Sequence, residues 1–189
     1  MELTVTEYAV LGLLCEGERS GYDLVRDARR SIGFFWAPAQ SHVYRVLPRL
    51  VERDLAERRV VAQATRPDKQ VYRLTGAGQD ELRRWLETVD EEPAGGSGVW
   101  LLKLFFGAAA SGESADAQLA AYRRTLEQRL AFWEELERGL AWHDDPEAVH
   151  QLVVLRHGLT RARATLGWVE ESRAALAAAR LTRTADGRS

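Results

Sequence analysis

The chain has 189 residues, enough for one large domain or two small ones with a buried core. Its 26 basic and 28 acidic residues leave a formal net charge of -2, so the overall charge argues for no particular partner by itself. Between Arg45 and Arg73, however, eight basic residues stand against four acidic ones, which indicates a local contact with a polyanion.

Cys15 is the single cysteine, which excludes a disulfide framework and a cysteine-based zinc site. It lies in an apolar run, so we expect a buried thiol. No basic-then-apolar leader is present, and the apolar run at 99–106 is interrupted by Lys103 and too short to span a bilayer. These features predict a cytoplasmic protein with no membrane partner.

Two helices are predicted in the first 35 residues. Thr4 and Glu7 have the spacing of a capping box, and the apolar positions that follow recur with helical period. Ser20 with Asp23 predicts the start of the second helix. Pro38 then biases the residue before it away from the helical region and marks a connector.

The segment 41–54, "SHVYRVLPRLVERD", predicts a third helix with two different faces. One face is apolar, and the other carries hydrogen-bond donors and fixed positive charges. Pro48 removes a backbone donor and predicts a slight kink near Tyr44 to Pro48.

Beyond residue 54 the period changes to that of strands. "AERRVVAQA" and "QVYRL" favour two short strands, and "TRPDK" between them is typical of a turn. Thr75 predicts the cap of a fourth helix. The order helix, helix, helix, hairpin is typical of a winged helix-turn-helix domain.

The fold class is therefore mainly α with a small two-stranded β wing, followed by helices. "DEEPAGGSG", residues 90–98, is a linker after a DNA-binding domain at 1–89. Residues 99–180 predict a C-terminal antiparallel helical dimerisation domain, whose last helix starts near Pro146. The tail at 181–189 has no packing pattern and is expected to be disordered.

Four motifs resemble the PadR-family transcriptional regulators: "LTVTEYAVLGLL", "SGYDL", "HVYRVLPRLVERDL" and "VYRLTGAGQDELRRWL". The remainder is similar to the long C-terminal domain of members that resemble virulence-gene regulators. The resemblance implies a homodimer formed by the C-terminal helices, a palindromic double-stranded DNA operator, and repression relieved by a small, often aromatic effector. Asp54 replaces the glycine usual in the family, and aspartate tolerates a left-handed backbone better than most residues.

A helix in the major groove places donors against base edges, and arginine pairs bidentately with guanine. We expect the start of the third helix to contact bases or nearby phosphates, and Arg49 to meet phosphate. Arg66 and Lys69 are expected to enter the neighbouring minor groove or to lie on its rim. The family resemblance implies backbone contacts for Tyr22 and Tyr44. The candidate DNA-binding residues are Tyr22, Gln40, Ser41, His42, Tyr44, Arg45, Arg49, Arg66 and Lys69.

Aromatic residues predict an effector cavity, although such residues also serve as plain core. The candidate effector-binding residues are Trp36, Trp100, Phe105, Phe106 and Trp133. The apolar stripes of the C-terminal helices predict an isologous dimer, with a monomeric hairpin as the alternative. The candidate dimerisation residues are Leu119, Tyr122, Leu126, Trp133, Leu159, Leu166 and Val169.

Two other functions compete with DNA binding. A winged helix can act as a protein-docking module, but docking surfaces favour apolar anchors over isolated charges. A metal-dependent hydrolase would need clustered ligands. His143, His150 and His157 recur every seven residues, about 10.5 Å along a helix, which is too far for one metal. We therefore expect no catalytic residues, no metal and no cofactor.

Overall fold

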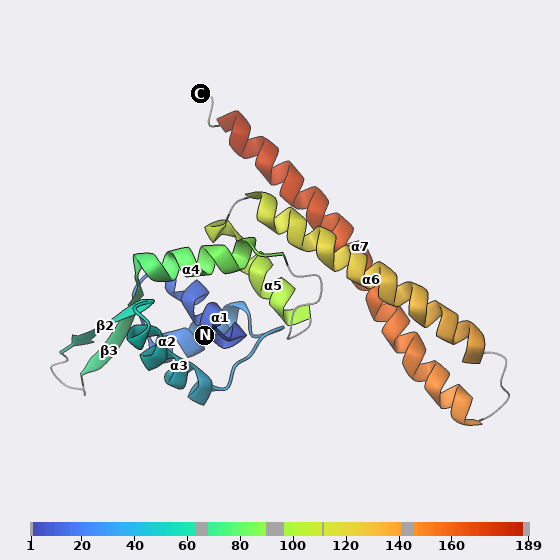
Figure 1. Cartoon of the computed structure of the whole chain (residues 1–189), viewed down its shortest axis with the longest axis horizontal. Coiled ribbons are helices and arrows are strands. Elements are labelled where there is room, and N and C mark those ends of the chain that lie inside the picture. The colour runs from blue at the N-terminus through green and yellow to red at the C-terminus, as the bar shows by residue number, and fades with distance from the viewer. Residues whose placement is uncertain (1, 63–67, 90–96, 111, 141–145, 187–189) are drawn as a thin grey trace. The chain divides into compact units, whose positions relative to one another are not determined.

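The computed structural model describes residues 2–62, 68–89, 97–110, 112–140 and 146–186, with side chains described as far as residue 180 (Figure 1). Contacts between Cα atoms divide the chain into two compact units. Unit 1 contains the helices α1 (Val5–Leu14), α2 (Gly21–Ser31), α3 (Gln40–Glu52), α4 (Gly76–Glu87) and α5 (Ser97–Phe105), the 3-10 helix η1 (Gly107–Ala109), and three short strands. Unit 2 consists mainly of α6 (Gly112–Leu140) and α7 (Pro146–Asp186).

The helix starts of unit 1 follow the capping residues predicted from the sequence. The Thr4 side chain accepts from the backbone N–H of Glu7, whose carboxylate accepts from the backbone N–H of Thr4 in return. Ser20 and Asp23 form the same reciprocal pair at α2, and Thr75 caps α4. These side chains satisfy amides that the first turn of a helix leaves without backbone partners. The predicted starts of all three helices are confirmed.

The sheet has three antiparallel strands in the order β1 (Arg19–Ser20), β3 (Lys69–Leu74) and β2 (Ala56–Val61). β2 and β3 form the predicted hairpin, with Arg58 opposite Tyr72. On its other edge β3 pairs with the two residues that precede α2, Arg19 and Ser20. The wing is therefore joined by a third strand that the sequence analysis did not predict, because two residues are too few to show strand periodicity.

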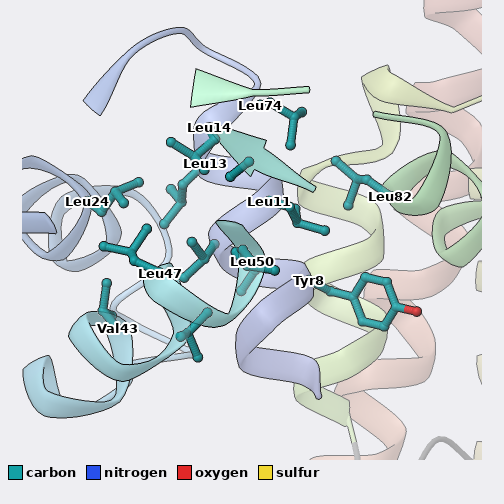
Figure 2. Packing of buried hydrophobic residues seen from close by; sticks show 14 of the residues in the cluster. Tyr8, Leu11, Leu13, Leu14, Leu24, Val43, Leu47, Leu50, Leu74 and Leu82 are labelled. Atoms are coloured by element: carbon teal, nitrogen blue, oxygen red, sulfur yellow. The ribbon is translucent and has the colours of Figure 1, made fainter. Parts of the chain in front are cut away.

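The core of unit 1 surrounds α1, which is buried from Glu7 to Leu14. Figure 2 shows leucines from α1, α2, α3, β3 and α4 meeting around it. The apolar side of α3 faces this core, so the donors on its other side are exposed. Those core residues of α3 are Val43, Val46, Leu47 and Leu50.

α5 also contributes to this core. Leu102 and Phe106 belong to the same buried cluster as α1. A Cβ on Gly12 would lie 2.7 Å from the Phe106 ring, so glycine at this position permits the close approach. Residues 99–110 therefore pack with the winged unit, and the domain boundary at residue 99 stays a prediction.

The two helices of unit 2 run antiparallel and are bridged by ion pairs. Glu134 and Glu137 on α6 pair with Arg163 and Arg156 on α7. Nearer the start of α6, Asp116 pairs with Arg173, with Nε to Oδ1 at 2.9 Å. α7 continues through 181–186, where the sequence analysis predicted a disordered tail. No proline or glycine occurs there before Gly187, so a helix that is already formed can propagate.

Two local expectations concern single residues of unit 1. Cys15, expected to be buried, is exposed at the end of α1, because the helix ends there and the chain turns away. Asp54 adopts the left-handed backbone that its position requires, with φ of 57°. The amides of Asp54 and Leu55 donate to the carbonyls of Val51 and Leu50, which closes the end of α3 as a Schellman motif.

Candidate nucleic-acid interface

The outer face of α3 brings most of the predicted contact residues together. Gln40, Ser41, His42, Arg45 and Arg49 are all exposed, on the side of the helix away from the core. Neither Arg45 nor Arg49 forms an ion pair with another residue in the described part of the chain. Two uncompensated guanidinium groups on an exposed helix provide charge and donors that suit a nucleic-acid backbone or base edge.

A shallow concavity of about 180 Å³ lies between this face and the start of α1. Its polar lining comes from His42, Arg45 and Arg49 on α3 and from Thr4 and Thr6. Thr6 was not among the predicted contact residues, because a lone threonine near a helix start carries no binding signal by itself. Only the packing of α1 against α3 brings its hydroxyl group beside the arginines.

The proline in α3 does not interrupt the helix. α3 continues from Gln40 to Glu52 with Pro48 inside it, and Pro48 is exposed. The slight kink near Tyr44 to Pro48 stays a prediction. No side chain caps the start of α3, where Ala39 is the N-cap residue.

Tyr22 and Tyr44 are both exposed beside the start of α2, at 65% and 45% of their areas. A Cβ on Gly21 would lie 2.8 Å from Cε1 of Tyr44, so the tyrosine ring packs directly over this glycine. Both tyrosines line a surface cavity of about 560 Å³ together with residues of β3 such as Lys69. The two tyrosine side chains therefore border the same cavity.

The wing residues differ from the α3 arginines. Lys69 forms an ion pair with Asp23 on α2, with Nζ to Oδ2 at 2.8 Å. Lys69 and Ser20 donate to the Asp23 carboxylate, and these hydrogen bonds hold its pKa well below the usual range. Arg66 lies outside the described residues. The position of Lys69 thus gives it a partner inside the protein, which its sequence context did not indicate.

The predicted effector residues serve several separate packing roles. Phe106 is part of the unit 1 core, and Trp36 packs against that core while partly exposed. Trp100 is buried, whereas Phe105 is 43% exposed. Trp133 lies in unit 2, where its ring is 3.7 Å from the position of a Cβ built on Gly158. The role of these residues in effector binding stays a prediction.

Most of the predicted dimerisation residues are buried within the single chain. The buried ones are Leu119, Tyr122, Leu126, Leu159 and Val169, while Trp133 and Leu166 are half-buried. Large apolar side chains that the chain leaves exposed occupy other positions of the same two helices. The exposed residues are Phe132, Leu136, Val149, Val153, Val154 and Trp168.

Within the described ranges, no three histidine, cysteine, aspartate or glutamate side chains are grouped as a metal site. Across the same ranges, no helix combines the length and hydropathy needed to cross a lipid bilayer. A three-helix core with a β wing and an exposed cationic third helix defines a winged helix-turn-helix protein.

Family models match both parts of the chain. The Transcriptional regulator PadR-like family matches residues 10–84, and the Virulence activator alpha C-term model matches residues 99–177. The Mycobacterium tuberculosis protein named probable transcriptional regulator Rv1176c is 30% identical, covering 89% of this chain and 96% of its own. The chain belongs to the PadR-like family of transcriptional regulators, and it is a regulator rather than an enzyme.

A second relative is the negative transcriptional regulator PadR of Bacillus subtilis, 28% identical over 89% of this chain and 95% of that one. A crystal structure of Bacillus subtilis PadR with operator DNA is 28% identical, covers 92% of this chain and 99% of that one, and has a TM-score of 0.47. Another contains p-coumaric acid, with 26% identity, coverage of 91% and 95%, and a TM-score of 0.42.

Proposed function

We propose that this protein is a homodimeric, sequence-specific DNA-binding repressor whose α3 enters the major groove of a palindromic operator. The observation that carries the proposal is the outer face of α3. Its arginines are exposed and form no ion pair with described residues, while the opposite face is fixed in the core. A rigid helix that presents unpaired donors has the geometry needed to read base edges.

The dimer is supported by the exposed apolar residues of α7. At about 100° per residue, Val149, Val153, Val154 and Trp168 fall within an arc of about 140° on one side of the helix. Leu159 and Val169, which are buried, fall on the opposite side. An apolar stripe that a single chain leaves uncovered suits an isologous contact with a second copy.

Repression and effector release are the finer parts of the proposal. The Bacillus subtilis relative is named a negative regulator, which supports repression by this chain. A structure of that regulator holds p-coumaric acid, which supports a small aromatic effector here. Binding to an operator also requires the compartment that holds the DNA, so the proposal includes a cytoplasmic location.

The test of this proposal is operator binding by Arg45→Ala. Genomic fragments selected by the purified parent protein supply the operator, and fluorescence anisotropy measures Kd at fixed salt. Losing a guanidinium contact to a base or phosphate is expected to weaken binding by about 10- to 100-fold. Arg83→Ala is the matched control, because Arg83 is an exposed arginine on α4 that pairs with Asp80. Equal binding by Arg45→Ala and the parent would contradict the assignment of α3.

Salt dependence separates DNA binding from docking to a protein. Neutralising phosphates releases counterions, so affinity for duplex DNA falls steeply as salt rises. A parent protein that selects no genomic fragment and shows no salt-dependent affinity for random duplex would instead favour a docking module.

A further inference from the structure

The first turn of α2 connects the wing to α3 through two adjacent contacts. At Asp23, the carboxylate accepts from Lys69 at the start of β3. At Gly21, the absence of a side chain lets the ring of Tyr44 on α3 pack against the backbone. The wing and α3 therefore both contact the first turn of α2.

Asp23 is held firmly by groups of its own helix. Its Oδ2 atom accepts from the backbone N–H of Ser20 at 3.1 Å and from the Ser20 hydroxyl at 2.6 Å. Arg26 adds a longer contact to Oδ1 at 3.3 Å. The Asp23 side chain is only 15% exposed, so it cannot swing away to follow a moving partner.

The sheet strengthens this attachment. Ser20 pairs with Val71 of β3 in the third strand, and Lys69 lies two residues before Val71 on the same strand. β3 is thus attached to the start of α2 by backbone pairing at Val71 and by an ion pair two residues nearer the hairpin turn. Together these contacts fix the direction of β3 relative to α2.

Moving Lys69 to a DNA phosphate would break its pair with Asp23. The mostly buried Asp23 carboxylate would then keep only the bonds from Ser20 and the longer contact to Arg26. Removing the lysine from a carboxylate that is largely shielded from water costs free energy. By contrast, Arg45 and Arg49 can turn to DNA without leaving an acidic partner among the described residues. The wing lysine and the helix arginines are therefore suited to different tasks.

From this arrangement we infer that the Asp23–Lys69 pair is a latch that positions the wing relative to α3, so that Lys69 is a positioning residue and not a phosphate ligand. The inference rests on the proposed DNA-binding function and deepens it. It replaces the expectation that Lys69 reaches the minor groove.

The test compares Lys69→Met, Asp23→Asn and the double variant, each as the full-length protein on the selected operator. If the pair acts as a latch, each single variant weakens operator binding by about five-fold or more. The affinity of the double variant is then no lower than that of the single variant that binds less tightly. The slope of log K against log salt stays at the parent value, because no phosphate contact is lost. Lys69→Arg, which can still pair with Asp23, restores affinity.

A lysine that contacted phosphate would behave differently. Lys69→Met would then lower the salt slope by about 0.9, the value for one phosphate contact. Asp23→Asn would bind as tightly as the parent or more tightly, because it releases the lysine. Either result overturns the latch.

The Asp23→Asn variant retains the cap of α2, because asparagine keeps an oxygen that can accept from Ser20.

Arg73→Met is the matched control, because Arg73 is a wing cation that pairs with Glu57 inside the hairpin and not with α2. Hydrogen exchange provides a readout that needs no DNA. The latch predicts faster exchange of the Val71 and Tyr72 amides in Lys69→Met and Asp23→Asn than in Arg73→Met. Unchanged exchange in both would contradict it. A parent that binds no duplex contradicts the proposed function, while the exchange result still tests the latch.

Discussion

The two units bury their apolar residues in different ways. In unit 1, α1 is buried from Glu7 to Leu14, and the surrounding elements supply all the cover within one chain. In unit 2, α7 runs from Pro146 to Asp186 but has few buried side chains and leaves Val153 and Val154 more than 60% exposed. The stability of unit 1 should therefore not depend on protein concentration, whereas the state of unit 2 should.

The largest expected effect is on dimerisation. Val153→Glu puts a carboxylate into the exposed stripe of α7, and two-fold symmetry would bury that charge twice. We expect the dissociation constant of the dimer to rise by about 1000-fold or more, equivalent to about 4 kcal/mol. Light scattering coupled to size-exclusion chromatography measures the change, and far-UV circular dichroism checks the helices. Val60→Glu, at a valine of β2 that is 56% exposed, should leave the proposed dimer intact. A dimeric Val153→Glu protein would place the interface elsewhere.

The next effect is on the core of unit 1. Leu11 is fully buried in α1, so Leu11→Ala should lower the free energy of unfolding by about 3 kcal/mol through lost burial and a cavity. Chemical denaturation followed by tryptophan fluorescence measures it, and the loss should be the same at each protein concentration. Val60→Ala, at a site 56% exposed, should cost less than about 0.5 kcal/mol. A loss for Leu11→Ala that varied with concentration would contradict the contrast between the units.

A smaller effect of opposite sign is expected at Asp54. Its φ of 57° strains an L-residue, and glycine relieves that strain at the cost of a more flexible unfolded chain. Asp54→Gly should raise the free energy of unfolding by about 0.5 kcal/mol, and Asp54→Ala should lower it. Thermal denaturation curves of the parent, Asp54→Gly and Asp54→Ala give the order of their stabilities. If alanine proved as stable as glycine, backbone strain at this position would be negligible.

An effect of about the same size concerns one ion pair of unit 2. Arg173 donates a hydrogen bond to Asp116 and holds the pKa of that carboxyl below its usual value. Because the pKa is lowered in the folded state, the pair stabilises the protein above the ordinary aspartate value of about 4 and loses its contribution as pH falls below it. Both side chains are partly exposed, so Arg173→Met should cost about 0.5 kcal/mol at pH 7. Denaturation of the parent and of Arg173→Met at pH 7 and pH 3 should show that the substitution lowers the free energy of unfolding less at the lower pH.

Local signals in the sequence predicted unit 1 well. Thr4 with Glu7 and Ser20 with Asp23 satisfy helix starts through residues three positions apart, so the spacing alone identifies them. The alternation of faces in α3 likewise follows from the positions of its apolar residues. Asp54 was expected to accept a left-handed backbone, and it does.

Features that depend on distant partners were not predictable in the same way. The sequence shows that Lys69 is a cation but not that Asp23 lies beside it, 46 positions earlier in the chain. An apolar stripe shows that a helix packs, but not against what. Leu119 and Leu159 were therefore predicted at a dimer contact, although a single chain already buries them. Phe106 was predicted to line an effector cavity, and the sequence did not indicate that its ring packs in the core beside Gly12.

The place of Phe106 in the unit 1 core has a practical consequence for preparing a DNA-binding fragment. A fragment ending at residue 89 would lack α5 and uncover the apolar surface of α1 that Leu102 and Phe106 seal. Such a fragment would tend to aggregate on expression, since exposed apolar surface promotes association. Unit 1 extends to Ser114, whose hydroxyl donates to the backbone carbonyl of Leu86 on α4. A fragment meant for crystallisation with duplex DNA should therefore end after Ser114.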